Sequence, residues 1–286
     1  MHVEFATLPG SGADRVNEDW VGACASVAIV LDGVTAPGGM PTGCIHGVPW
    51  YVNQLGAHFL REATVNSGMT LSSCLASAIS ETADDHAETC DPMDPGTPSA
   101  TVAALRLRDN EWEYLVLADA TLVMETVSGL EVVTDQSVLN YASAQRQALY
   151  DCEPGTSRHT EMLHALVSEQ RKFRNEPGGY WLAAAKPEAA AHAVVGTAPR
   201  EALRRAAIMS DGAAAMVDTY ASWTWSEYMD TLDRFGVGPA LVALRAVEAS
   251  DPHLTRWPRY KASDDATLLY LRTAAGSWDH RGELPP

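Results

Sequence analysis

Short apolar runs that adjoin acidic residues are the most informative pattern along this chain of 286 residues. Three such runs stand beside Asp pairs or Asp-Gly pairs: residues 25–31 before Asp32-Gly33, residues 206–210 before Asp211-Gly212, and residues 266–272 after Asp264-Asp265. Apolar runs of this length, bounded by turn-forming residues, predict buried strands. We therefore expect three strands that carry carboxylates at their ends.

Two segments show the spacing of amphipathic helices. Apolar residues recur at helical intervals from about Val48 to Glu62 and from Leu71 to about Glu81. The prolines and glycine of residues 91–99 (DPMDPGTPS) break any helix there. We expect the first helix to cover one face of a sheet.

Four short β-rich runs follow, at residues 100–107, 112–118, 122–127 and 130–133. Turn-forming pairs such as Asp109-Asn110 and Ser128-Gly129 separate them, which predicts an antiparallel meander. The residues from Gln136 to Arg174 are mostly polar and helix-prone. Because the sequence contains no repeat and no linker, we expect a single domain over residues 1–286.

Composition excludes several classes of protein. Apolar residues make up 46% of the sequence, enough to fill a sizeable core. The formal net charge of −17 argues against nucleic-acid or membrane partners and suits a site that collects cations, although acidity alone also serves solubility. The five cysteines are widely spaced without a CxxC pair, so we expect reduced thiols rather than disulfides or a zinc ribbon. Without a leader-like N-terminus or an apolar span, we expect a cytoplasmic protein.

The acids suggest a specific chemistry. Hydrolysis of a phosphate monoester requires neutralised phosphoryl oxygens and an activated water, which two divalent cations about 4 Å apart can provide. Carboxylate oxygens are the ligands that such hard cations prefer. The spacing of the acids does not show that they converge, and a single Asp-Gly pair is also an ordinary turn.

Seven motifs in order resemble the PP2C-type phosphatases: RVNED (15–19), VLDG (30–33), TPSATVAAL (97–105), LADA (117–120), VTDQS (133–137), MSDG (209–212) and SDDATLLYL (263–271). The resemblance implies an α+β fold, a four-layer αββα sandwich of two antiparallel sheets flanked by helices. It also implies a cleft that holds two Mg²⁺ or Mn²⁺ ions, and a variable helical or flap segment at about 136–180.

The resemblance assigns roles to individual residues. Asp32 matches the acid that bridges both metals, while Glu18 and the carbonyl of Gly33 match ligands of one ion. The remaining matches are Asp211 and Asp264 to ligands of the other ion, Asp119 to the acid of a weaker third metal, Asp19 to an acid that orients water, and Arg15 to the arginine that binds phosphate.

The sequence departs from the family pattern at several points. Val34-Thr35 follows Asp32-Gly33 where other members have His-Gly or Met-Gly-Gly, so the histidine that protonates the leaving group in some members is absent. Arg15 lies one residue closer to Glu18 than the arginine of the family does, and LADA replaces Gly-Asp-Ser-Arg.

The segment TGCIHGVPW contains Cys44 and His46 and lies outside the family pattern. The favoured interpretation is a loop at a helix start with a packed cysteine and a polar histidine. Alternatively, His46 supplies the missing acid, or Cys44 contacts the substrate. A thiol enzyme with Cys44 as nucleophile and His46 as base is the less favoured third option.

The function that fits best is hydrolysis of phosphoserine or phosphothreonine in proteins, the substrates usual in the family. A small phosphorylated metabolite is an alternative substrate. A catalytically weak regulatory or binding module on the same fold is a second alternative, favoured by the missing histidine and the altered LADA segment. The sequence does not specify the oligomeric state.

Overall fold

The computed structural model describes residues 2–10 and 16–273, which form two five-stranded antiparallel sheets. One, the β9 sheet, has the strand order β1 (His2–Leu8), β10 (Ala266–Arg272), β9 (Leu203–Met209), β6 (Thr121–Thr126) and β7 (Gly129–Val133). The other, the β4 sheet, has the order β2 (Trp20–Ala23), β3 (Val27–Gly33), β4 (Ala100–Arg108), β5 (Glu111–Leu117) and β8 (Val194–Pro199).

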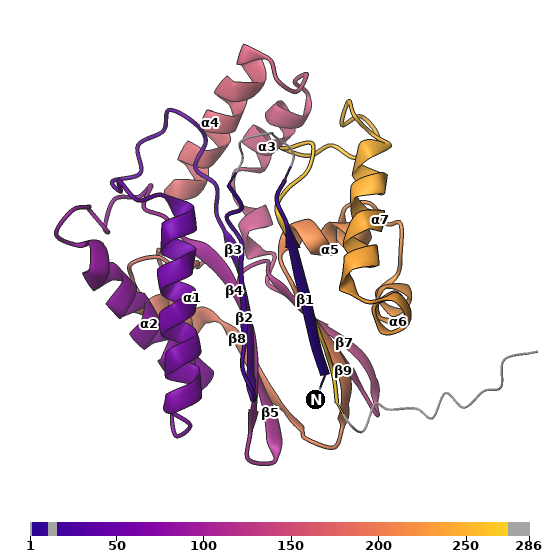
Figure 1. Ribbon diagram of the computed structural model, residues 1–286. Coiled ribbons are helices and arrows are strands. Elements are labelled where there is room, and N and C mark those ends of the chain that lie inside the picture. The colour runs from indigo at the N-terminus through magenta and orange to yellow at the C-terminus, as the bar shows by residue number, and fades with distance from the viewer. Residues whose placement is uncertain (1, 11–15, 274–286) are drawn as a thin grey trace, which may run out of the picture.

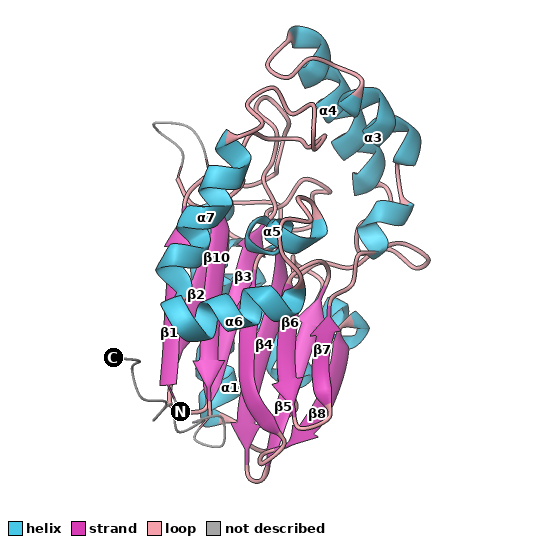
Figure 2. Cartoon of the chain, turned by 90° about the vertical axis from the view of Figure 1, so that its right-hand side faces the viewer, coloured by secondary structure: helices cyan, strands magenta, loops and turns pink. Residues whose placement is uncertain are grey.

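Helices cover the outer faces of both sheets (Figure 1). The β4 sheet is covered by α1 (Val48–Val65) and α2 (Leu71–His86), and the β9 sheet by α5 (Asp211–Asp218), α6 (Trp225–Phe235) and α7 (Val237–Ala249). Beyond one end of the sheets, Figure 2 shows α3 (Ser143–Tyr150) and α4 (Ser157–Arg171). Two short 3₁₀ helices, η1 (Ser137–Asn140) and η2 (Pro187–His192), complete the described elements. This arrangement confirms the predicted αββα sandwich.

The apolar runs are explained by burial on both faces of each strand. In β3, Val27, Ile29 and Leu31 pack with α1 and α2, whereas Ala28 and Val30 pack against the other sheet. Strand β10 likewise divides its side chains between the helices and the space between the sheets. Because successive strand residues point to opposite faces, a strand enclosed on both sides is apolar throughout.

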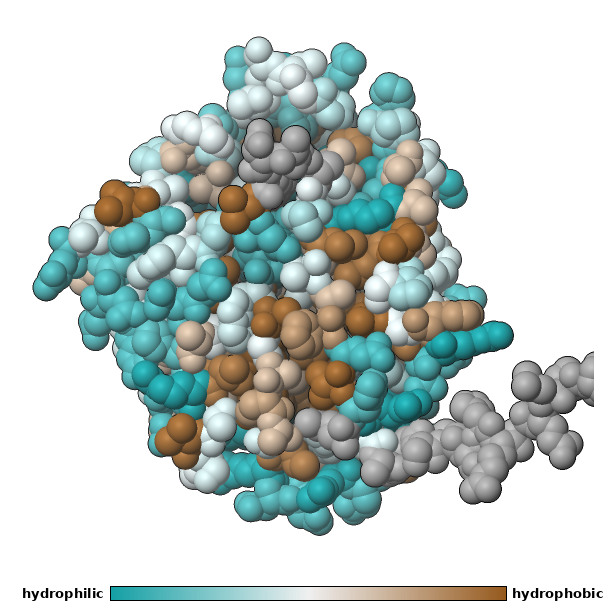
Figure 3. Space-filling model, in the orientation of Figure 1, coloured by the Kyte–Doolittle hydropathy of each residue, from teal (hydrophilic) through white to brown (hydrophobic). Residues whose placement is uncertain are grey.

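In contrast to the buried strands, the helices that cover the sheets expose polar residues to solvent. The face over α1 and α2 is mostly hydrophilic in Figure 3, while apolar residues gather nearer the centre of that view. Phe5 of the edge strand β1 is 54% exposed. Among the described residues, no helix combines the length and apolar character that crossing a membrane requires.

The predicted meander is wrong. Strands β4 and β5 form one hairpin and β6 and β7 another, but β5 pairs with β8 and β6 with β9. The chain therefore changes sheets between β5 and β6, where Ala118 has a left-handed φ of 62°. The pattern of apolar runs and turns locates strands but carries no information about their distant partners.

A buried ion pair attaches α1 and α2 to the β4 sheet. Arg106 is 2% exposed and donates from Nη2 to Glu113 Oε2 at 2.5 Å. The same guanidinium donates to the carbonyls of Ala63 and Met69, at the end of α1 and just before α2. Glu113 Oε1 accepts from the backbone N–H of Leu71, the first residue of α2.

We predict that Glu113→Ala lowers the free energy of unfolding by about 3–5 kcal/mol, because Arg106 would remain buried without its counter-charge. The matched control is Glu111→Ala, since Glu111 lies on the same strand but is exposed. Urea titrations followed by circular dichroism would measure both. Similar small losses in the two variants would contradict the proposed role of the pair.

Candidate metal centre at one end of the sheets

Four chain segments bring acids to the same end of the two sheets. Asp32 and Gly33 end β3, Asp211 follows β9, and Asp264 precedes β10. Asp119 lies where the chain changes sheets. All five residues line one cleft of about 410 Å³. The structure therefore shows that these acids converge, which their spacing in the sequence does not reveal.

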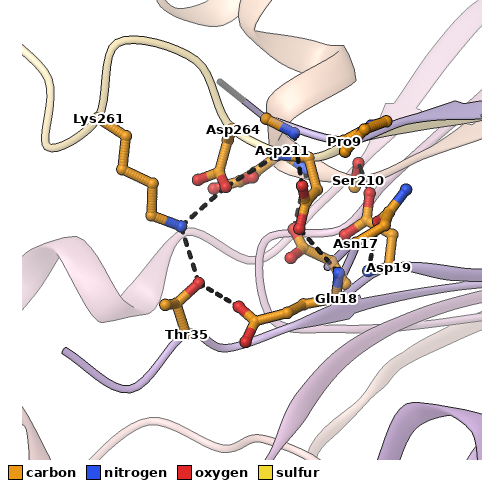
Figure 4. Close-up of polar contacts among 12 residues, drawn as sticks. Pro9, Asn17, Glu18, Asp19, Thr35, Ser210, Asp211, Lys261 and Asp264 are labelled. Carbon is orange, nitrogen blue, oxygen red and sulfur yellow. Dashed lines mark hydrogen bonds and ion pairs between the residues drawn. The ribbon is translucent and has the colours of Figure 1, made fainter. Parts of the chain in front are cut away.

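Polar contacts connect the two sides of this cleft (Figure 4). The backbone N–H of Asp211 donates to Asp32 Oδ2 at 3.2 Å. The Thr35 hydroxyl donates to Glu18 Oε2 at 2.5 Å, and Lys261 Nζ donates to Thr35 Oγ1 and Asp264 Oδ1, each at 2.8 Å. Lys261 thus joins the Glu18 side to the Asp264 side, a role that sequence reasoning missed because no motif contains it.

Asp265 is a second residue whose role was missed. Its side chain is buried, and its two oxygens accept from the N–H groups of Gly10 at 2.6 Å and Glu18 at 2.8 Å. The Asp264-Asp265 pair is visible in the sequence, but the family resemblance gives a role only to Asp264. In the structure Asp264 faces the cleft, whereas Asp265 holds the backbone that carries Glu18.

The glycines of the Asp-Gly pairs permit close packing rather than turns. A Cβ on Gly33 would lie 2.3 Å from the carbonyl oxygen of Glu18, and one on Gly212 would lie 2.0 Å from that of Asp265. Neither glycine has a positive φ. Any larger residue would therefore push apart the segments that carry the acids.

The surroundings of Asp32, Asp19 and Asp119 raise the pKa of each carboxyl group. Burial raises the pKa of Asp32 well above its usual range, and the charges of Asp211 and Asp19 add to the effect. Burial also raises the pKa of Asp19 and of Asp119 to about 7. The cluster holds more negative charge than its surroundings balance, a condition that a divalent cation relieves.

Asp19 supports this interpretation. Its Oδ2 accepts from the Ser210 hydroxyl at 2.9 Å, but its buried Oδ1 has no hydrogen-bond partner among the described residues. A buried carboxylate oxygen without a donor is unfavourable unless a water or cation completes its environment. The donor set and this oxygen both fit hard divalent cations.

For two predicted residues, the described part of the chain shows no place in this arrangement. Arg15 lies outside the described residues. A second cavity of about 270 Å³, lined by Glu18 and Thr35 among others, adjoins the cleft. His46 lines neither the cleft nor this adjoining cavity, and its ring stacks on Trp50 at 4.3 Å between centroids. Its role as a leaving-group acid stays a prediction.

Comparison with known proteins identifies the family. The model of the family Protein phosphatase 2C matches residues 14–244. The chain belongs to the protein phosphatase 2C family. This PP2C domain is therefore of the metal-dependent serine/threonine phosphatase type, a class of hydrolases. No curated protein sequence matches the chain.

Solved structures agree in fold with this PP2C domain at low sequence identity. The serine/threonine phosphatase PstP/Ppp of Mycobacterium tuberculosis is 13% identical, with a TM-score of 0.55 over 94% of this chain and 97% of that one. PppA, described as a regulatory component of T6SS in Pseudomonas aeruginosa, is 17% identical, with a TM-score of 0.55 over 95% and 96%. A structure of the PstP catalytic domain with 2 manganese ions is 14% identical, with a TM-score of 0.54 over 94% and 96%.

The helical segment over the cleft, residues 136–180 with α3 and α4, is attached to the rest of this PP2C domain on two sides. Tyr150 of α3 stacks on Tyr260 at 5.6 Å between ring centroids, and Arg146 donates to the Tyr260 hydroxyl at 2.8 Å. On the other side, Arg174 donates to Ser99 and to the carbonyl of Thr97. Arg174 therefore joins the segment after α4 to the loop that precedes β4.

We predict that Gly212→Ala destabilises this PP2C domain by about 1–3 kcal/mol, because the added methyl group overlaps the Asp265 carbonyl. Gly238→Ala is the matched control: each glycine is the second residue of its helix, but a methyl group added at Gly238 would have no atom within 4 Å. Helix propensity alone would stabilise both variants by up to about 1 kcal/mol. Equal stabilisation in urea titrations would therefore refute the close-packing argument.

Proposed function

We propose that this chain hydrolyses phosphate monoesters, with phosphoserine and phosphothreonine in proteins as its substrate class. The observation that carries the proposal is the convergence of Asp32, Asp211 and Asp264 in one cleft, with Glu18 connected to it through Thr35 and Lys261. Two of the structures similar in fold are serine/threonine phosphatases, which supports the substrate class.

The residues present fit two Mg²⁺ or Mn²⁺ ions. Asp32 would bridge them, Glu18 and the Gly33 carbonyl would hold one, and Asp211 and Asp264 the other. Asp119, next to the same acids, would hold a weaker third ion. When bound, such cations neutralise the phosphoryl oxygens and lower the pKa of water.

Protein side chains would position the reactants. Asp19, held by Ser210, would accept a hydrogen bond from the attacking water through its unpartnered Oδ1 and so orient it. Lys261 brings a positive charge to the wall of the cleft, where the ester's phosphoryl group would approach Asp264. The helical segment from α3 to α4 lines the opposite wall and would exclude bulk water from part of the cleft.

The source of the leaving-group proton follows from the residues around the cleft. Among the described residues, neither the cleft nor the adjoining cavity is lined by a histidine. We infer that solvent protonates the departing alkoxide. Hydrolysis of aryl phosphates, whose leaving groups need no proton, should therefore be faster than hydrolysis of alkyl phosphates.

We predict that Asp32→Ala lowers kcat/KM for p-nitrophenyl phosphate about 10³-fold or more while the fold survives, because several kcal/mol of charge stabilisation are lost. Asp109→Asn is a suitable control, since Asp109 lies in the exposed turn between β4 and β5. Activity would be measured with EDTA and then with excess Mn²⁺. Retained activity of Asp32→Ala at saturating Mn²⁺ would contradict the two-cation site.

We further predict that Asp211→Asn and Asp264→Asn weaken Mn²⁺ binding and are partly rescued by excess cation, because Asn keeps one neutral oxygen ligand but loses the charge. Titration calorimetry would measure the affinity. Unchanged affinity in both variants would count against these ligands. An absence of metal-dependent hydrolysis in the unmodified chain, with intact metal binding, would instead favour a binding module.

A further inference from the structure

A second cluster of metal-ligating residues lies outside the acidic cleft. Cys44 and His46 come from the loop before α1, His86 is the last residue of α2, and Cys90 follows it. One potential ligand atom from each of the four residues lies within 4.8 Å of the other three. The cluster thus joins segments more than forty residues apart in the sequence.

Four of the six separations between these atoms match a tetrahedral metal site, and the other two are within 4.8 Å. Cys44 Sγ lies 3.8 Å from His46 Nδ1 and 3.6 Å from His86 Nδ1, while Cys90 Sγ lies 3.5 Å from Cys44 Sγ and 3.4 Å from His46 Nδ1. A tetrahedral zinc ion, with bonds of about 2.3 Å to sulfur and 2.0 Å to nitrogen, separates its ligand atoms by about 3.3–3.8 Å. The four side chains therefore surround a space of the right size.

Backbone N–H groups face both sulfur atoms, and an aromatic ring holds the histidine rings in place. The backbone N–H of His46 donates to Cys44 Sγ, and that of Ile45 donates to Cys90 Sγ, both at 3.4 Å. Trp50, in the first turn of α1, stacks on His46 and lies 5.2 Å from the His86 ring between centroids. Such contacts orient metal ligands before the metal arrives.

We propose that Cys44, His46, His86 and Cys90 bind one structural Zn²⁺ ion. Two thiolates and two imidazoles form a closed four-ligand set, which suits zinc and disfavours Mg²⁺ and Mn²⁺. The site is separate from the proposed carboxylate centre in both position and ligand chemistry. It also gives His46 a different role from that of leaving-group acid.

The zinc site would fix two loops beside the acidic cleft. The loop that contains Cys44 begins after Gly33, and the loop that contains Cys90 begins after His86 and leads into β4. The two are joined by a hydrogen bond from Asp91 N–H to the Gly43 carbonyl at 2.8 Å. Arg171 of α4 donates to the Pro41 carbonyl at 3.0 Å, so the ion would also support the docking of α4.

The test uses the purified full chain and element-specific mass spectrometry. We expect about one zinc per chain in the unmodified protein and almost none in Cys44→Ser/Cys90→Ser. Cys152→Ser is the control, because Cys152 bonds to a carbonyl of α3 and lies outside the cluster. Asp32→Ala should retain its zinc, which separates this proposal from the carboxylate centre.

Cobalt provides a readout that does not require folding of the variants. Unmodified chain stripped of zinc and loaded with Co²⁺ should show the intense visible bands of a tetrahedral ion and thiolate charge-transfer absorption. Weak octahedral-type bands alone, without tetrahedral bands or thiolate charge-transfer absorption, would overturn the proposal, and so would zinc that persists in Cys44→Ser/Cys90→Ser. A Cys44–Cys90 disulfide in the freshly purified, zinc-free chain would overturn it as well.

Paired histidine variants distinguish a zinc ligand from a leaving-group acid. If both histidines bind zinc, His46→Ala and His86→Ala should lose zinc similarly and change hydrolysis of phosphoserine and p-nitrophenyl phosphate by similar factors. A loss of about 10²-fold or more on phosphoserine alone, confined to His46→Ala with zinc retained, would instead identify a general acid and refute the role of His46 as a ligand.

Discussion

The mutual repulsion of carboxylates enclosed at one end of two sheets is the constraint on which the rest of the structure depends. Burial and neighbouring charges raise the pKa of Asp32 well above its usual range, so the cluster is unfavourable on its own. The fold nevertheless holds the acids together with backbone devices: glycines that allow contact at Gly33 and Gly212, and the buried Asp265 that binds two N–H groups. Such strain at a cleft is consistent with a site whose stability depends on bound cations.

The sandwich and the site are coupled through strand ends. Each sheet delivers acids from strands buried on both faces, so the positions of Asp32 and Asp211 follow from the packing of β3 and β9. The helical segment over the cleft rests on loops rather than on the sheets, through Arg146, Arg171 and Arg174. The packed sheets thus fix the positions of the acids. The loops that hold the helical segment, including those of the Cys/His cluster, shape the entrance of the cleft.

The sequence was most informative where local pattern and function coincide. Strand β10 has the predicted bounds, and α1 begins at the predicted Val48. The partner of β5 was not predictable, because hydrophobic alternation carries no information on distant pairing. The role of Lys261 was not predictable because Lys261 belongs to no motif. The link from Cys44 to His86 and Cys90 was not predictable either, because α2 extends five residues past its predicted end at Glu81. That extension brings His86 to the loop of Cys44.

The most direct test of the central claim is the location of Mn²⁺ in a crystal of the full chain, by anomalous diffraction. The account predicts two manganese peaks, both within bonding distance of the Asp32 carboxylate and flanked by Glu18 on one side and Asp211 and Asp264 on the other. A crystal saturated with Mn²⁺ in which no peak lies within bonding distance of Asp32 would contradict it.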